Sequence, residues 1–354
     1  MKRKSAQKNH RRKIVSRGKK KLFYKAVSVV LTFAVSFVFL AILSAYKYLD
    51  SSFASAQSYK YDRNAYTSDQ FPTLVYAVTT DTNKNPIFIS ELKYIIFDKL
   101  NNRMLVYEIP TQAAYDIPGK YGEEQFSKIV ALAGLNSDDE IRQGAELLKG
   151  TLFKIIGYKT DRFLFVDEGH SRIFDELLGN GSFLDLIKIK DIISSRDNFK
   201  TDLSFEEFYD LFSFVKKLPN DRIEEKLLSE NDLANPEESI DQVLIDMNED
   251  STVASESKSI SVLNGTDTPG VAYLGTRIIN NMGGRVVASG NADRTYSTSV
   301  IITDDPNSET CRLLSEVFGI YNIVQKDGNN LGEHEIDRSD IVVIIGFDTS
   351  YKLY

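Results

Sequence analysis

The sequence predicts an α/β protein with an N-terminal transmembrane helix, a mixed-sheet α/β domain and a small βαββαβ-like α+β domain. Residues 26–46 form a 21-residue stretch without charge behind a basic tail. In the rest of the chain, short apolar runs typical of strands alternate with segments of 3.6-residue periodicity. An acidic stretch at residues 229–258 divides these elements into two groups, and 354 residues are enough for about two domains.

The distribution of charge is uneven. Residues 1–25 hold twelve of the 43 Lys and Arg and no acid, which leaves 31 bases against 50 acids in the rest of the chain. A folded portion that is acidic on average disfavours nucleic-acid binding. One cysteine and three scattered histidines exclude a disulfide framework and give no ligand spacing for a metal. We therefore expect no nucleic-acid partner and no metal site.

The basic tail, residues 1–25, and the uncharged segment, residues 26–46, predict a membrane anchor. A helix of 21 residues spans about 30 Å, the thickness of the hydrocarbon core. The positive-inside rule places the basic tail in the cytoplasm and everything after residue 47 outside. The alternative is a signal peptide cleaved after Ala56, but the apolar run is longer than is usual for such peptides.

Residues 47–70 are rich in Ser, Ala and Tyr without an apolar period, which indicates a stalk. The first domain then covers residues 71–228. The apolar patterns predict strands at 74–79, 92–97, 104–109 and 161–166, and helices at 122–135, 138–156, 170–178 and 205–218. Ser204 and Glu207 have the spacing of a capping box, which favours a helix that begins at residue 205.

Residues 229–258 carry nine acids against one base, and this composition is typical of a linker, with a short helix at 240–247 as an option. The second domain covers residues 259–354. The pattern there predicts strands at 259–263, 285–288, 299–303 and 340–345, with helices at 270–282 and 308–318. These elements form a small α+β domain with its helices on one face of the sheet.

The second domain resembles the C-terminal domain of LytR-type cell-envelope proteins. The resemblance rests on Val-Leu-Asn-Gly-Thr at 262–266, Pro-Gly-Val-Ala at 269–272, Ser-Val-Ile-Ile-Thr at 299–303 and the strand at 340–348. It spans most of residues 259–348. The motif positions are Asn264, Gly265, Gly270, Gly346 and Asp348, and each has an ordinary structural interpretation as a turn or packing residue.

The first domain is similar, over about residues 71–228, to the LytR-CpsA-Psr catalytic domain of bacterial envelopes. The segment at 109–119 keeps the Ile-Pro frame of that family at Ile109, Pro110, Ile117, Pro118 and Gly119. The resemblance implies transfer of glycopolymers from polyprenyl-pyrophosphate carriers to peptidoglycan, with arginines on the pyrophosphate and acids on magnesium. Such chemistry needs bidentate cations and oxygen ligands.

The residues that this chemistry needs are replaced. Thr111 and Gln112 stand where the family motif has Arg and Asp, and Ile-Ser-Glu at 89–91 stands where a typical member has Arg-Ser-Asp. The weak candidates for a divergent site are Glu91, Arg103, Arg142, Arg162 and Arg196. A further pair, Cys311 and His334, has the residue types of a nucleophile and its base, but a structural thiol is the ordinary interpretation.

Three functional hypotheses follow. The first is a membrane-anchored, extracytoplasmic and non-catalytic relative of the transferases, which binds a lipid-linked glycan, wall glycan or envelope protein. The second is an active, divergent phosphotransferase, the only case in which a cofactor, magnesium, is expected. The third is a purely structural module that makes protein contacts. Two cations around one pocket would favour the second hypothesis.

Overall fold

The computed structural model describes residues 24, 25, 27–41, 43, 44, 47, 70–82, 86–119, 121–135, 139–178, 198–327 and 332–353. The chain divides into two compact units, residues 1–52 and 53–354. In the first unit residues 27–41 are helical, and the apolar side chains of this helix are exposed. Among the described residues, no helix combines the length and the apolar character that crossing a membrane requires.

The second unit begins with a mixed six-stranded sheet in the order β7-β6-β1-β2-β3-β8. The pairs β1/β6 and β3/β8 are parallel, while β1/β2, β2/β3 and β6/β7 are antiparallel. The strands are β1 (Thr73–Thr79), β2 (Ile89–Asp98), β3 (Arg103–Glu108), β6 (Arg162–Asp167), β7 (Phe199–Thr201) and β8 (Ile223–Leu227). The predicted mixed sheet is therefore confirmed.

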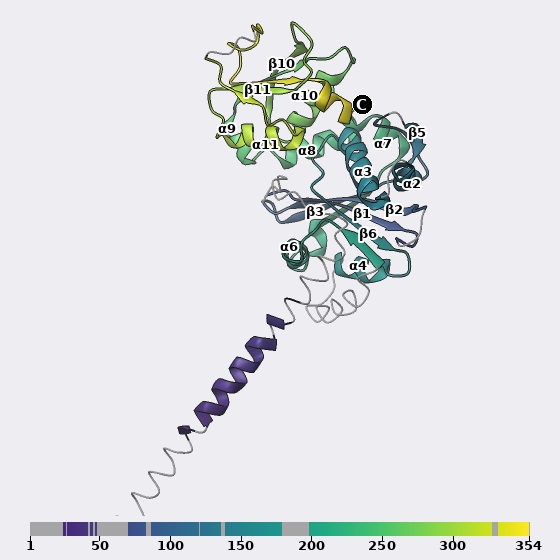
Figure 1. Cartoon of the computed structure of the whole chain (residues 1–354), viewed down its shortest axis with the longest axis vertical. Coiled ribbons are helices and arrows are strands. Elements are labelled where there is room, and N and C mark those ends of the chain that lie inside the picture. The colour runs from purple at the N-terminus through teal and green to yellow at the C-terminus, as the bar shows by residue number, and fades with distance from the viewer. Residues whose placement is uncertain are drawn as a thin grey trace, which may run out of the picture. The chain divides into compact units, whose positions relative to one another are not determined.

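Helices cover both faces of this sheet, with α3 on one face and α4 and α6 on the other (Figure 1). Their bounds are Glu140–Ile156 for α3, Ser171–Leu178 for α4 and Phe205–Val215 for α6. Successive side chains of a strand point to opposite faces of the sheet. Phe163 and Phe165 therefore belong to the core with α3, whereas Arg162 faces α6. Every residue of β1 is buried, and burial of both faces explains why the strand is mostly apolar between its terminal threonines.

Residues 122–135 differ from the predicted helix. A hairpin of β4 (Ala114–Ile117) and β5 (Gly122–Gln125) comes first, then the short 3₁₀ helix η1 (Phe126–Lys128), and only α2 (Ile129–Gly134) is α-helical. Pairing with β4 decides the conformation of residues 122–125, which the helical period of their sequence does not reveal.

The acidic stretch at 229–258 is folded. It contains α7 (Glu230–Ala234), the π-helical turn η5 (Glu237–Asp241), α8 (Gln242–Met247) and α9 (Thr252–Glu256). Its apolar side chains are buried in the same core as α3 and the second sheet, namely Leu233, Ile240, Leu244, Met247 and Val253. The segment predicted from composition as a linker is thus a packed element, and the option of a helix at 240–247 is close to what is observed.

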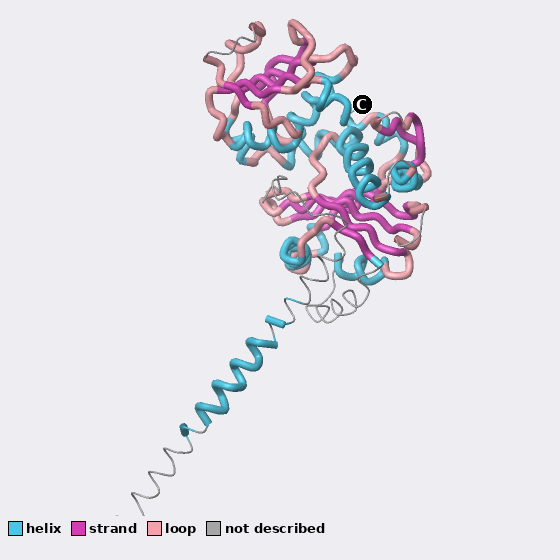
Figure 2. The backbone as a smooth tube through the Cα atoms, viewed as in Figure 1, coloured by secondary structure: helices cyan, strands magenta, loops and turns pink. Residues whose placement is uncertain are grey.

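The second sheet has five strands in the order β10-β9-β13-β11-β12, and Figure 2 shows its strands apart from those of the first sheet. Strands β10 and β13 run parallel to β9, and β11 runs antiparallel to β13. The elements are β9 (Ser259–Asn264), α10 (Val271–Asn281), β10 (Arg285–Asn291), β11 (Val300–Thr303), α11 (Glu309–Phe318), β12 (Ile323–Val324), β13 (Ile341–Ile345) and α12 (Phe347–Leu353). The sequence patterns missed two of these, the two-residue strand β12 and the C-terminal helix α12.

Candidate functional site

Thr111 and residues 89–91, which stand where the family has its Arg and Asp residues, lie at the edge where β1 and β6 end. Strand β1 ends at Thr79, β2 begins beside it, and the parallel strand β6 ends at Asp167. The segment after β3 closes over this edge, because the hydroxyl of Thr111 donates to the carbonyl oxygen of Ser90 at 3.3 Å. We call this edge the strand-end edge.

The described part of the strand-end edge carries carboxylates. Glu91 is exposed on β2, and the nearly buried carboxylate of Asp167 accepts a hydrogen bond from the backbone N–H of Thr82 at 2.8 Å. Burial raises the pKa of Asp167 above its usual value. Within the described residues no group of three or more His, Cys, Asp or Glu side chains is arranged to hold a metal ion.

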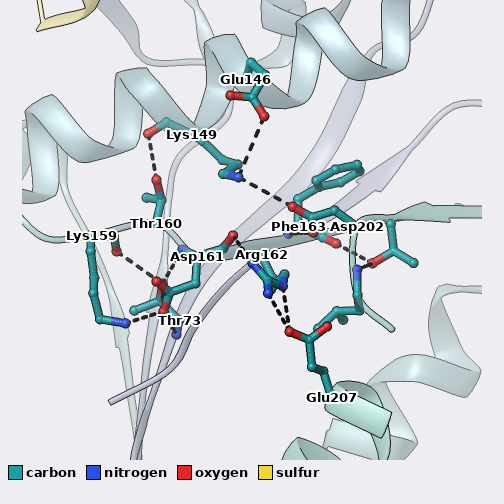
Figure 3. A network of polar contacts seen from close by, with 12 residues as sticks. Thr73, Glu146, Lys149, Lys159, Thr160, Asp161, Arg162, Phe163, Asp202 and Glu207 are labelled. Carbon is teal, nitrogen blue, oxygen red and sulfur yellow. Dashed lines mark hydrogen bonds and ion pairs between the residues drawn. The ribbon is translucent and has the colours of Figure 1, made fainter. Parts of the chain in front are cut away.

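Two of the candidate arginines, Arg103 and Arg162, lie elsewhere and have their own carboxylate partners. Arg103 lies opposite Asp98 at the far end of β2 and donates to it at 2.7 Å. Glu91 and Asp98 are separated by seven residues of one strand, which is about 24 Å. Arg162, buried at the start of β6, donates to Glu207 of α6 through Nε at 3.1 Å (Figure 3). Neither arginine reaches Glu91.

Of the remaining two arginines, only Arg142 lies within the described residues. Arg142 lies in the first turn of α3, where its backbone N–H donates to the Asp139 side chain that caps the helix. Arg196 lies outside the described residues. The structure thus brings no two of the three described candidates, Arg103, Arg142 and Arg162, to a common pocket with Glu91.

The Ile-Pro frame of residues 109–119 has a packing role. Ile109 and Ile117 are buried in the main core, and Gly119 has a φ of 84°, a left-handed conformation that favours glycine. Pro110 lies beside Ile109 and its carbonyl oxygen accepts from Ala113 N at 3.2 Å, which turns the chain toward β4. Pro118 and Gly119 also line a cavity beside α3.

The turn after β9 is stabilised by its own side chains. Asn264 Oδ1 accepts hydrogen bonds from the N–H and the hydroxyl of Thr266, at 2.9 and 2.8 Å. Its amide nitrogen donates to the Thr268 carbonyl oxygen at 2.9 Å. A Cβ on Gly265 would lie 3.0–3.1 Å from Tyr296 and Ile344. These motif residues are therefore occupied in forming the turn.

The other motif positions of this domain also stabilise loops. Gly270 precedes α10 with a φ of 87°. The carboxylate of Asp348 accepts from the Ser299 hydroxyl at 2.6 Å and from the Ser299 N–H at 2.9 Å, which joins the start of β11 to α12. Gly346 lies against the backbone of the same segment, because a Cβ there would come within 2.7 Å of the Tyr296 carbonyl oxygen.

The Cys311 and His334 pair is not a dyad. Cys311 is fully buried on α11, and burial raises the pKa of its thiol to about 11. His334 is exposed, and its Nδ1 lies 2.6 Å from the carboxylate of Asp293. The thiol is a packing residue of the core.

Sequence reasoning missed a buried polar network at the opposite end of β1 and β6 (Figure 3). Asp161 accepts from the N–H of Thr73 at 2.9 Å and forms an ion pair with Lys159, and both charged side chains are at most 5% exposed. Burial lowers the pKa of Lys159 below its usual value, against the opposing effect of Asp161. The signal in the sequence is a charged pair, Lys159 and Asp161, directly before an apolar strand. This network borders the cavity beside α3.

Comparison with known proteins gives a family match and several structural similarities. Residues 257–348 match the family model described as LytR cell envelope-related transcriptional attenuator. No curated protein matches the chain. The solved structure of TagT bound to LI-WTA is similar at 13% identity and a TM-score of 0.36, over 53% of this chain and 96% of that one.

Two further solved structures have similar identities, TM-scores and coverages. TagV from Bacillus subtilis is 11% identical with a TM-score of 0.35, over 46% of this chain and 85% of that one. The LytR-CPS2A-psr family protein YwtF (TagT) with bound octaprenyl pyrophosphate lipid is 14% identical with a TM-score of 0.32, over 49% and 83%. The family match covers the same region as the resemblance drawn from the motifs, and residues 257–348 of this chain are a LytR C-terminal domain.

Proposed function

We propose that this protein is a membrane-anchored, extracytoplasmic component of the bacterial cell envelope. During wall glycopolymer assembly it binds a lipid-linked glycan, wall glycan or envelope protein, without transferring the polymer itself. The basic tail and the uncharged segment at 26–46 support the anchor and its orientation. The LytR C-terminal domain supports the envelope role. A reporter fused after residue 354 that is active only in the cytoplasm would contradict this topology.

The observation that carries the non-catalytic part is the charge of the strand-end edge. A pyrophosphate requires at least two cations around one pocket, because its charges are otherwise unscreened in a partly buried groove. The described residues place Glu91 and Asp167 at this edge, and Arg103 and Arg162 pair with carboxylates elsewhere. The described carboxylates at this edge do not supply the cations that a pyrophosphate needs.

The test is calorimetric titration of the full-length protein in detergent with a short polyprenyl pyrophosphate, with and without magnesium. TagT has been seen with octaprenyl pyrophosphate, which makes this ligand the appropriate probe. We expect no magnesium-dependent binding in a preparation that circular dichroism shows to be folded. Micromolar binding that needs the metal would contradict the proposal and favour the divergent transferase.

A transfer assay gives an independent measurement. We expect no transfer of glycopolymer to peptidoglycan by the wild-type protein. Transfer that is lost in Glu91→Ala and retained in Glu206→Ala, a variant of an exposed glutamate on α6, would establish an active site at the strand-end edge. That result would replace the docking proposal with the divergent phosphotransferase.

A further inference from the structure

A cavity of about 590 Å³ lies along one side of α3, away from the strand-end edge. Its walls come from α3, the turn of the β4–β5 hairpin, the loop before β6, the end of α11 and α12. The size is within the range of small-molecule sites in proteins. Since the cavity adjoins the starts of β1 and β6, and the strand-end edge lies at their ends, the two features are independent.

The charged residues of the cavity do not balance. Three carboxylates line it, Glu146, Asp161 and Glu316, against two lysines. Lys159 is paired with Asp161, and Lys149 lies 3.8 Å from Glu146 and 3.5 Å from Asp202 (Figure 3). The lysines of the lining therefore already have carboxylates beside them, which leaves the cavity with a surplus negative charge at Glu316.

Glu316 is incompletely compensated. Its Oε2 is buried and accepts no hydrogen bond from the described residues, among which Arg312 Nη1 lies 3.6 Å away. The Arg312 guanidinium also donates to Glu309, at 3.1 Å from Nε, so its charge is shared. Burial raises the pKa of Glu316; Arg312 opposes this rise, while Glu309 and Asp161 add to it. The Glu316 side chain is 19% exposed although its Oε2 is buried, so a ligand would meet the accessible part of the side chain.

Part of the remaining lining is apolar and fits an aliphatic body, beside the polar side chains of Tyr121, Gln143 and Tyr351. Phe153 and Phe318 meet edge to face at 6.1 Å, and Leu147 and Val317 also belong to the lining. The hydroxyls of the lining threonines are already in hydrogen bonds: Thr160 donates to the Lys149 carbonyl oxygen at 3.3 Å, and Thr349 accepts from Ser299 at 2.8 Å. A sugar ring needs several such partners, whereas a methylene chain needs none.

We propose that this cavity binds a lysine-type side chain, with its methylene stem against the apolar wall of Phe153 and Phe318 and its ammonium group at the Glu316 carboxylate. A charge-assisted N–H···O bond to the accessible part of the carboxylate would add a second cation beside Arg312. The ligand would be a peptide that presents a primary amine on an aliphatic chain. This inference goes beyond the proposed function and does not depend on it.

The experiment is calorimetric titration of the full-length protein in detergent with Nα-acetyl-lysine methylamide. A second arm uses the same compound acetylated on Nε, and a third uses glucosamine, whose amine has a polyhydroxylated body. We expect binding of the lysine compound, and binding weaker by at least tenfold for the acetylated compound and for glucosamine.

The matched variants are Glu316→Gln and Glu309→Gln, which change two glutamates of one helix that both contact Arg312. Glu316 lines the cavity and Glu309 does not. We expect the first variant to bind the lysine compound at least tenfold more weakly and the second to bind within twofold of wild type. Equal binding of the acetylated compound, unchanged binding by Glu316→Gln, or no binding by folded wild-type protein at millimolar ligand would overturn the proposal. Equal or tighter binding of glucosamine would assign the site to amino sugars instead.

Discussion

Gly346 illustrates how closely single residues pack in the second domain. An added Cβ would lie 2.7 Å from the Tyr296 carbonyl oxygen, 2.8 Å from the Thr298 carbonyl carbon and 2.9 Å from the Ser299 nitrogen. These are backbone atoms, which cannot rotate away as a side chain can. We expect Gly346→Ala to lower the free energy of unfolding by about 1–3 kcal/mol, measured by urea denaturation of the full-length protein followed by circular dichroism.

The matched control is Gly290→Ala. Gly290 lies in β10, and nothing is within 4 Å of the position that its Cβ would take. The alanine should therefore leave stability unchanged or raise it by up to about 1 kcal/mol, through the lower entropy of the unfolded chain. Similar effects at the two glycines would show that the close approach at Gly346 is not what limits substitution.

The same residues show what the sequence can predict at this scale. The turn at Asn264 and Gly265 was predictable, because its hydrogen bonds join residues within four positions of each other. The importance of Gly346 is not local, since the atoms that exclude a side chain there come from residues 296–299. The hydrogen bond of Arg162 to Glu207 is likewise not local, since it joins residues that are 45 positions apart. A single sequence does not reveal such contacts.

At the scale of the element, α6 combines a predictable start with an unpredicted contact. The capping box is present as expected: Ser204 Oγ accepts from the Glu207 N–H at 3.2 Å, and the Glu207 side chain accepts from the Ser204 N–H at 2.8 Å. The other carboxylate oxygen of Glu207 accepts from the buried Arg162 of β6. One glutamate thus caps the helix and holds it against the sheet.

This double role predicts a pH dependence. Burial acts to raise the pKa of Glu207, but the hydrogen bond and charge of Arg162 outweigh burial and hold it below its usual value. A carboxyl group whose pKa is lowered by folding stabilises the protein above its unfolded pKa of about 4.3, and this contribution is lost as the pH falls through the lower, folded value. Stability should therefore decrease on acidification below about pH 4.3.

The variant Glu207→Gln should isolate this contribution. We expect it to lose about 1–3 kcal/mol at pH 7, the range for hydrogen bonds to charged groups, and to lose less than wild type between pH 5 and pH 3. Urea denaturation at each pH is the measurement. Glu206→Gln, which changes the exposed neighbour, should follow the wild-type curve. If the free energy of unfolding of Glu207→Gln and of wild type fell equally on acidification, the assignment to Glu207 would be contradicted.

Elements defined by long apolar runs were predictable, whereas those defined by their partners were not. Strands β1 and β6 and helix α3 lie within two residues of the ranges expected from periodicity. Residues 122–125 form a strand only because residues 114–117 pair with them. Residues 229–258 fold because Ile240, Leu244 and Met247 find a core on neighbouring elements, even though the composition of the segment is that of a linker.

At the scale of residues 70–353, one arginine connects the described elements most extensively. Arg277 of α10 donates to both carboxylate oxygens of Asp241 in η5, at 2.7 and 2.8 Å. It also donates to the carbonyl oxygens at the end of α3, those of Lys154, Ile155 and Ile156, at 2.9–3.1 Å. A cation at this position satisfies carbonyl groups that a helix leaves unpaired and interacts favourably with the helix dipole. The acidic stretch therefore supplies the counter-charge that lets α10 approach α3.

We expect Arg277→Ala to destabilise the protein by about 3–5 kcal/mol, because Asp241 would remain as a buried charge without its cation. Both side chains are 9% exposed, so water cannot replace the lost contacts without a rearrangement. Urea denaturation gives the total loss, and hydrogen exchange should report faster exchange in both α10 and the end of α3. The control is Lys258→Ala, which removes an ion pair with Asp305, whose side chain is 53% exposed, and should cost less than about 1 kcal/mol. If Arg277→Ala were no more destabilising than this control, apolar packing alone would hold α3 and α10 together. The counter-charge of Asp241 would then not be needed for their contact.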